Sequence, residues 1–212
     1  YDASFRLQKE NGVVQKVVDY PVYFRNVAKE KLPEENSKVS LWATNLSQSI
    51  NPGWVIILTP LVVAFFTFLR SRKKEPSTPT KIAFGLLISA LSVLVMVAAV
   101  KMGGNGSEKV SVWWLVANYG IITIGELFLS PMGLSVVSKL SPTNITSLMM
   151  GGWFLSTSIG NKLSGVLASM WDTYEDKTDF FWINFSLLMF ATVLMFVLLK
   201  QLNKVMQEKG IN

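Results

Sequence analysis

The chain has 212 residues, of which 50% are hydrophobic and 16% are charged, with a net charge of +6. It contains no cysteine and no histidine, which excludes disulfides, thiol chemistry and the side chain that most often carries protons near neutral pH. Any proton chemistry must therefore use carboxylates, no cofactor is expected, and nothing indicates a nucleic-acid partner. Long apolar runs predict an all-α, polytopic membrane protein.

Residues 1–40 are expected to form a loop in water on the extracellular or periplasmic side. This segment carries seven Lys or Arg and six Asp or Glu residues, and two prolines interrupt its weak apolar pattern. The chain opens at Tyr1 without an initiator Met, a signal peptide or a cleavage site. We therefore expect the sequence to begin inside a longer polypeptide.

A first membrane span is predicted over residues 41–69, which contain no charged residue. Its first half is polar and its second half is strongly apolar. Thr44, Gln48 and Asn51 fall on one face at helical spacing, so their side chains can point into a cavity near one membrane side. For Gln48 a role as a tie between helices is an equal alternative.

The next loop, residues 70–81, has five cationic residues and one acidic residue, which predicts a cytoplasmic location. A second span follows over residues 82–100. Its only polar side chains are Ser89 and Ser92, and we expect this helix to be peripheral and to face lipid.

The third span, residues 110–139, has one charged residue near its middle, Glu126, and one at its end, Lys139. A carboxylate at mid-membrane costs at least about 2.5 kcal/mol, and such residues usually mark a pathway for ions, protons or substrate. Four other residues share its helical face: Tyr119, Thr123, Ser130 and Gly133. The alternative is a neutral Glu126 that ties two helices together by hydrogen bonds.

The fourth span is predicted over residues 145–171. Gly152, Ser156, Gly160 and Ser164 recur at every fourth residue, a ridge that allows close approach of another helix. Beside this ridge lies a polar and aromatic stripe that could line a pocket. The stripe comprises Trp153, Thr157 and Asn161. Lys162 is expected to extend its amine toward the membrane surface.

A fifth, apolar span over residues 180–200 leads to a cytoplasmic tail, residues 201–212. The complete bundle is thus expected over residues 41–206. The first, third and fourth spans carry polar faces, whereas the second and fifth do not. This pattern predicts three helices around a wet cavity and two that brace them, as part of a larger bundle.

Three motifs resemble the proton-dependent oligopeptide transporters of the major facilitator superfamily. They are NLSQSINPGWVIILTPL at residues 45–61, GELFLSPMGLS at 125–135 and MMGGWFLSTSIGN at 149–161. Their order and spacing agree with this family. The resemblance implies that the five spans are helices eight to twelve, which form most of the C-terminal bundle of a major-facilitator fold.

The resemblance also implies roles for individual residues. Glu126 stands where the family binds the amino terminus of the peptide, and we expect it to be linked to the proton as well. Asn51 matches a substrate-contacting asparagine, Trp153 a tryptophan that lines a side-chain pocket, and Thr157 a position with a hydroxyl residue. Gln48 and Ser130, on the polar faces described above, complete the predicted substrate site.

The implied function is part of a proton-coupled symporter that imports di- and tripeptides by alternating access, as a multi-pass protein of the cell (inner) membrane. Its expected partners are small peptides, protons, the lipid bilayer and the missing N-terminal half, without which this chain should not transport. Alternatives are a related transporter for another solute such as nitrate or a glucoside, a structural membrane subunit, or an intramembrane enzyme that uses Glu126. No paired carboxylate supports the enzyme.

Overall fold

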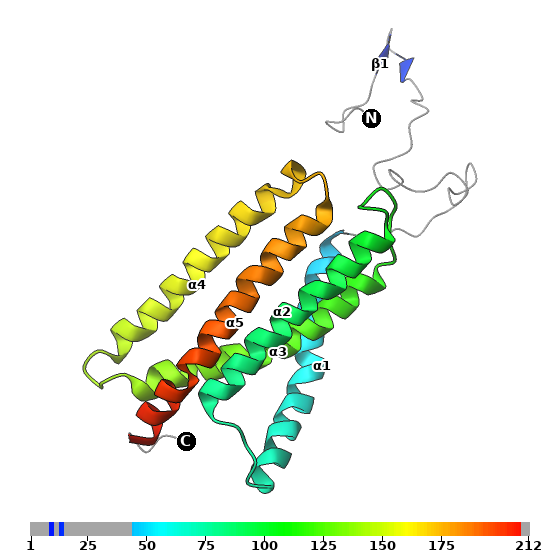
Figure 1. Cartoon of the computed structure of the whole chain (residues 1–212). Coiled ribbons are helices and arrows are strands. Elements are labelled where there is room, and N and C mark those ends of the chain that lie inside the picture. The colour runs from blue at the N-terminus through cyan, green and yellow to red at the C-terminus, as the bar shows by residue number, and fades with distance from the viewer. Residues whose placement is uncertain (1–8, 11–12, 15–43, 209–212) are drawn as a thin grey trace. The chain divides into compact units, whose positions relative to one another are not determined.

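The computed structural model describes residues 9–10, 13–14 and 44–208 (Figure 1). Two short strands, β1 (Lys9–Glu10) and β2 (Val13–Val14), pair as an antiparallel hairpin. They belong to a unit, residues Tyr1–Trp42, that is separate from the unit Ala43–Asn212. The predicted loop over residues 1–40 otherwise lies outside the described residues.

The second unit is helical throughout its described part, which confirms the all-α prediction. Its helices are α1 (Thr44–Ser71), α2 (Thr78–Met102), α3 (Trp113–Leu140), α4 (Thr146–Ser169) and α5 (Lys177–Glu208). A short 3-10 turn at Trp171–Thr173 precedes α5. The helices agree with the predicted spans to within a few residues, except at the end. There α5 continues to Glu208, so most of the expected tail is helix.

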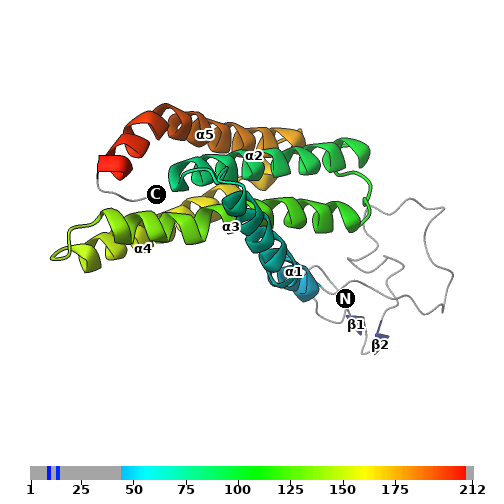
Figure 2. The ribbon, with the colours of Figure 1, turned by 90° about the horizontal axis from the view of Figure 1, so that it is seen from below.

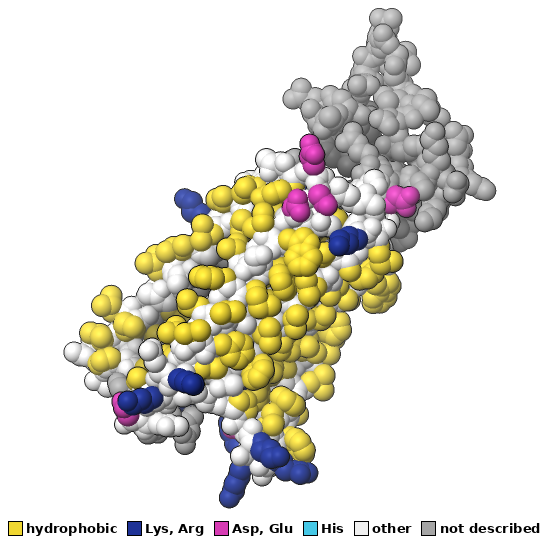
Figure 3. Space-filling model, viewed as in Figure 1, with side chains coloured by type: hydrophobic (Ala, Val, Ile, Leu, Met, Phe, Trp, Pro, Cys, Tyr) yellow, Lys and Arg dark blue, Asp and Glu magenta, His cyan; other side chains and the backbone are white. Residues whose placement is uncertain are grey.

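Within the described residues, four helices are long and apolar enough to cross a membrane, namely α1 from Leu46 onward, α2, α3 and α5. Many of their large apolar side chains point outward, such as Ile56 (76% exposed) and Val197 (71% exposed). Apolar side chains cover the visible face along the length of the helices in Figure 3. Large exposed apolar surfaces of this kind mark contacts with a membrane or with further protein. The 24-residue helix α4 is not one of these four, and its membrane crossing stays a prediction.

The helix α2 packs between α3 and α5, as Figures 1 and 2 show. The prediction that this span faces lipid is therefore wrong for the side that carries Ser89 and Ser92, whereas Phe84 and Leu91 are 43% and 45% exposed and the peripheral position of the helix stays a prediction. Ser89 and Ser92 are only 5% and 1% exposed, and Ala83 and Ala90 are fully buried. Inside a membrane, apolar character does not drive a helix outward, because lipid is equally apolar. Small side chains instead decide which helices approach closely.

The closest packing joins α2 to α3 at two glycines. A methyl group added to Gly85 would lie 2.9 Å from the carbonyl oxygen of Gly125. One added to Gly125 would lie 2.8 Å from the carbonyl oxygen of Gly85 and would overlap the hydroxyl of Ser89. Backbone therefore contacts backbone here, which only glycine permits. This contact fixes the position of α3, and therefore of Glu126, along the axis of α2.

The predicted small-residue ridge of α4 makes no such contact. Added methyl groups at Gly152 and Gly160 would meet nothing within 4 Å among the described residues. Among these residues α4 packs mainly on α3. The close helix approach predicted for this ridge is therefore absent from the described part of the chain.

A clamp joins the α2–α3 loop to the segment before α5. The Asn105 amide donates a hydrogen bond to the carbonyl of Glu175 (2.8 Å) and accepts one from the backbone N–H of Lys177 (2.6 Å). Asn105 has a φ of 59°, a left-handed conformation that asparagine tolerates better than most residues. The clamp thereby links two loops that are 70 residues apart in sequence.

Candidate functional site

The predicted central carboxylate, Glu126, lies on α3 beside Asn51 of α1. The Asn51 amide Nδ2 donates a hydrogen bond to Glu126 Oε2 at 3.2 Å. On the other side of the amide, Thr123 Oγ1 lies 3.1 Å from Asn51 Oδ1 and 2.7 Å from the carbonyl of Tyr119. A hydroxyl has one proton, so Thr123 shares it between these two acceptors. The result is a chain of polar groups that orients the amide toward the carboxylate.

The sequence pattern explains why these groups meet. Thr123 and Glu126 are three residues apart on α3 and therefore share a face, which is turned toward α1 at this level. Thr123 is fully buried, whereas Asn51 and Glu126 are half-buried. The carboxylate is thus partly open, while the groups that orient its partner are enclosed.

A tryptophan that the sequence analysis did not single out fixes α1 against α3. Trp54 donates from its indole Nε1 to the carbonyl of Val116 at 3.0 Å. Its ring lies over Gly120, where an added methyl group would be 3.2 Å from the ring carbon Cε2. Trp54 is three residues beyond Asn51, one turn along the same face, and this spacing is the signal that could have identified it.

Glu126 has one hydrogen-bond partner among the described residues, Asn51, and that partner uses Oε2. No Lys or Arg in the described part of the chain forms an ion pair with Glu126. An ionised carboxylate would therefore have an open oxygen and no fixed countercharge here. Such a group can bind an ammonium, a guanidinium or a proton.

Trp153 of α4 lies against Gly133 of α3. The tips of its indole ring occupy the space that a side chain at position 133 would need. Gly133 is on the same face of α3 as Glu126 and seven residues further on, about 10 Å along the helix axis. Trp153 therefore lines this face two turns from the carboxylate. The hydroxyl of Thr157 donates to the carbonyl of Trp153 at 3.1 Å and remains exposed.

The remaining predicted site residues are not gathered around the carboxylate. Gln48 on α1 and Ser130 on α3 are exposed, as is Lys162 on α4. The structure thus brings together Asn51 and Glu126, adds Thr123 and Trp54 as supports, and places Trp153 on the same face of α3. Contacts of Gln48, Ser130 and Thr157 with a substrate stay predictions.

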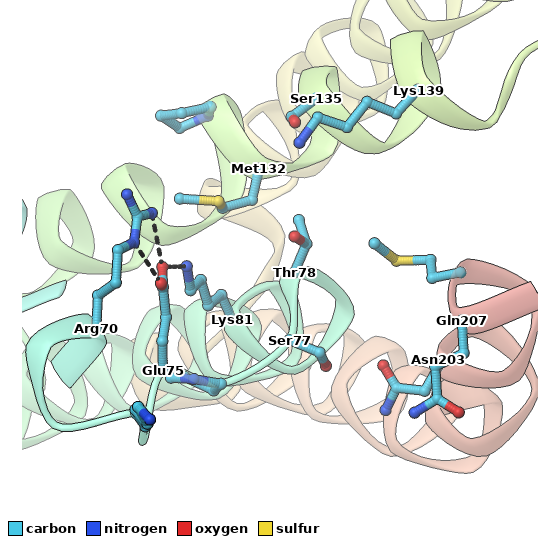
Figure 4. A pocket seen from close by; sticks show the side chains of 14 residues that line it. Arg70, Glu75, Ser77, Thr78, Lys81, Met132, Ser135, Lys139, Asn203 and Gln207 are labelled. Carbon is cyan, nitrogen blue, oxygen red and sulfur yellow. Dashed lines mark hydrogen bonds and ion pairs between the residues drawn. The ribbon is translucent and has the colours of Figure 1, made fainter. Parts of the chain in front are cut away.

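A cavity of about 820 Å³ lies elsewhere, at the end of the bundle that carries the basic α1–α2 loop. None of the six predicted site residues lines it. Its main feature is an ion cluster, drawn in Figure 4, in which Glu75 accepts from Arg70 Nε at 2.7 Å and pairs with Lys81. Hydrogen bonds from Arg70, then Lys81, lower the pKa of Glu75 to about 2. We refer to this space as the basic cavity.

Comparison with known proteins gives a consistent result. A family model described as PTR2, POT family, matches residues 43–183. The dipeptide and tripeptide permease A of Proteus mirabilis is 36% identical over 129 residues, which is 61% of this chain and 26% of that protein. An uncharacterized transporter, YclF, from Bacillus subtilis is 32% identical over 151 residues, 69% of this chain and 30% of that protein.

Solved structures show the same fold. A crystal structure of a POT family transporter in complex with a thioalcohol-conjugated peptide superposes with a TM-score of 0.64 at 28% identity, and covers 73% of this chain and 31% of the other. The chain thus spans about a quarter to a third of the length of the proteins it matches. These relatives are transporters and not enzymes, and the chain is part of a multi-pass protein of the cell membrane.

Proposed function

Because this chain belongs to the POT family, we propose that the polypeptide carrying it is a proton-coupled symporter that imports di- and tripeptides by alternating access. The observation that carries the proposal is the Asn51–Glu126 pair, with its partly open carboxylate in the middle of a membrane helix. The substrate class is supported by the name of the Proteus mirabilis relative, dipeptide and tripeptide permease A.

In this proposal Glu126 binds the amino terminus of the peptide. An ammonium has three N–H donors and a positive charge, and an ionised Glu126 offers a charge-assisted hydrogen bond at its open oxygen. The bond from Asn51 to Oε2 fixes the direction of the carboxylate before the peptide arrives. Preorganisation of this kind reduces the ordering cost of binding.

Proton coupling follows from the same carboxylate. A protonated Glu126 has no negative charge and loses most of its attraction for the ammonium, so proton binding and peptide binding compete at this residue. If one conformational state of the transporter favours the proton and another favours the peptide, the movement of the proton is coupled to that of the peptide. Among the described residues no Lys or Arg forms an ion pair with Glu126, so within this part of the protein the ammonium and the proton displace no ion pair.

The other predicted residues act on the rest of the peptide. Trp153 supplies an aromatic wall two turns from Glu126, at a distance that suits a side chain of a short peptide. Thr157, Gln48 and Ser130 supply exposed polar groups for its backbone. Thr123 and Trp54 are positioning residues, since they orient Asn51 and fix α1 against α3.

The test compares Glu126→Gln with the parent in the full native polypeptide that carries this sequence. Glutamine keeps the shape of the side chain and can still accept from Asn51, so folding should be preserved. Affinity for a free dipeptide should fall about tenfold or more, because one charge-assisted hydrogen bond contributes about 1.5 to 3 kcal/mol. Glu208→Gln, an exposed change of the same kind at the end of α5, is the matched control.

The decisive comparison repeats both measurements with the same dipeptide acetylated at its amino terminus. The acetylated peptide should bind the parent weakly and respond little to Glu126→Gln, because the ammonium is already absent. An equal loss for free and acetylated peptides would refute ammonium pairing. A parent that transports a solute without an amino group and ignores dipeptides would support the alternative substrate class. Normal transport by Glu126→Gln would indicate a structural role.

A further inference from the structure

The basic cavity has a strong excess of positive charge. Of the described residues, four cationic side chains line it, against the single carboxylate of Glu75. The cations are Arg70, Lys73, Lys81 and Lys139. They come from the end of α1, the α1–α2 loop, the first turn of α2 and the end of α3, and Figure 4 shows most of them around one space. Cations from four separate segments repel one another unless an anion joins them.

Glu75 accepts hydrogen bonds from only some of the N–H groups of Arg70 and Lys81. It accepts two of the five N–H groups of Arg70 and one of the three of Lys81. The Lys81 side chain is only 6% exposed, so water has little access to its amine. Lys81 also lies over the ring of Phe66, 4.5 Å from its centre. A buried cation with unused donors, at the wall of a cavity, favours a second anionic partner.

Two further features lie at the same wall. The first turn of α2 has no side-chain cap, because the hydroxyl of Ser77 pairs with that of Thr80 instead, so the positive end of this 25-residue helix faces the cavity region uncapped. Asn203 of α5 also lines the cavity, and its carbonyl oxygen Oδ1 is buried without a hydrogen-bond partner among the described residues.

From these observations we propose that the basic cavity binds a phosphate ester, with the phosphate oxygens among the four cations. A phosphate has enough oxygens to contact several cations at once, and arginine matches its geometry in pairs. The volume of about 820 Å³ suits a small headgroup. Such a ligand could be the headgroup of a phospholipid or a soluble phosphate ester.

The experiment measures ligand-induced thermal stabilisation and bound mass in the full native polypeptide after delipidation. The probes are short-chain phosphatidylglycerol, glycerol 3-phosphate, inorganic phosphate and a diacylglycerol of the same chain length that lacks phosphate. The test variant is Lys73→Gln with Lys139→Gln, since both side chains are exposed and neither belongs to the Glu75 cluster. Lys200→Gln with Lys204→Gln removes two exposed charges of α5 that do not line the cavity.

We expect the Lys73→Gln, Lys139→Gln variant to bind its phosphate ester about tenfold more weakly, and the α5 control to bind as the parent does. Stabilisation by phosphatidylglycerol alone identifies a lipid headgroup as the source, and stabilisation by glycerol 3-phosphate as well identifies the phosphate ester itself. The proposal is overturned if no phosphate-bearing probe stabilises more than diacylglycerol, or if both double variants lose affinity equally.

Discussion

The backbone contact between α2 and α3 makes Gly125→Ala the most informative single change in this bundle. In an open helix this substitution should stabilise by about 1 kcal/mol, because alanine is the better helix former. Here the added methyl carbon would lie 2.8 Å from the carbonyl oxygen of Gly85 and 3.1 Å from the backbone nitrogen of Ser89, and it would overlap the Ser89 hydroxyl.

Overpacking of a close interface costs about 1 to 3 kcal/mol. We expect the upper part of this range, because a backbone carbonyl cannot rotate away as a side chain can. The net effect of Gly125→Ala should therefore be a destabilisation of about 1 to 2 kcal/mol after the gain in helix propensity is subtracted. The sign is thus opposite to that expected from propensity alone, which makes the prediction easy to refute.

The assay is the melting temperature of the detergent-solubilised full polypeptide, measured for Gly125→Ala, Ser89→Ala and the double variant. Ser89→Ala removes the oxygen that the new methyl group overlaps, so it should recover part of the loss. The two changes should then be non-additive by about 0.5 kcal/mol or more. A stabilising Gly125→Ala, or strictly additive effects, would show that α2 and α3 do not meet at these glycines.

Three other changes test separate parts of the structure. Ser89→Leu should destabilise the protein as severely as other overpacked core variants, and a melting temperature equal to that of the parent would restore the lipid-facing interpretation of α2. Asn105→Ala should speed hydrogen exchange at the start of α5, since it removes both clamp bonds, whereas exchange rates equal to those of the parent would show that the clamp contributes nothing. The folded pKa of Glu75, about 2, lies below its ordinary value near 4.3, so its stabilising effect is complete above the ordinary value and is lost as pH falls toward 2. The difference in melting temperature between the parent and Glu75→Gln should therefore shrink below about pH 4, and a difference independent of pH between 6 and 3 would contradict the ion cluster.

The sequence alone located the helices and singled out Glu126 and Asn51 as candidate site residues. Apolar runs of about 20 residues can satisfy their backbone only as helices in lipid, so length and composition located all five. Helical spacing placed Asn51 and Glu126 each on the polar face of its own helix, and the resemblance assigned both to one site. Because a mid-membrane carboxylate is costly, Glu126 stood out without any knowledge of its neighbours.

Only the tertiary structure decided which helix faces lie against each other. The apolar sequence of α2 suggested that it faces lipid, but the helix packs between α3 and α5. Its small residues Gly85 and Ser89 allow the close approach to α3. In a membrane, close packing and not the hydrophobic effect decides which helices associate. The same limit applies to the small-residue ridge of α4, whose spacing is right but which contacts no helix in the described chain. The basic cavity could not be predicted from the sequence for a related reason. Its cations come from four separate segments, and their convergence depends on how α1, α2 and α3 end, which no local pattern records.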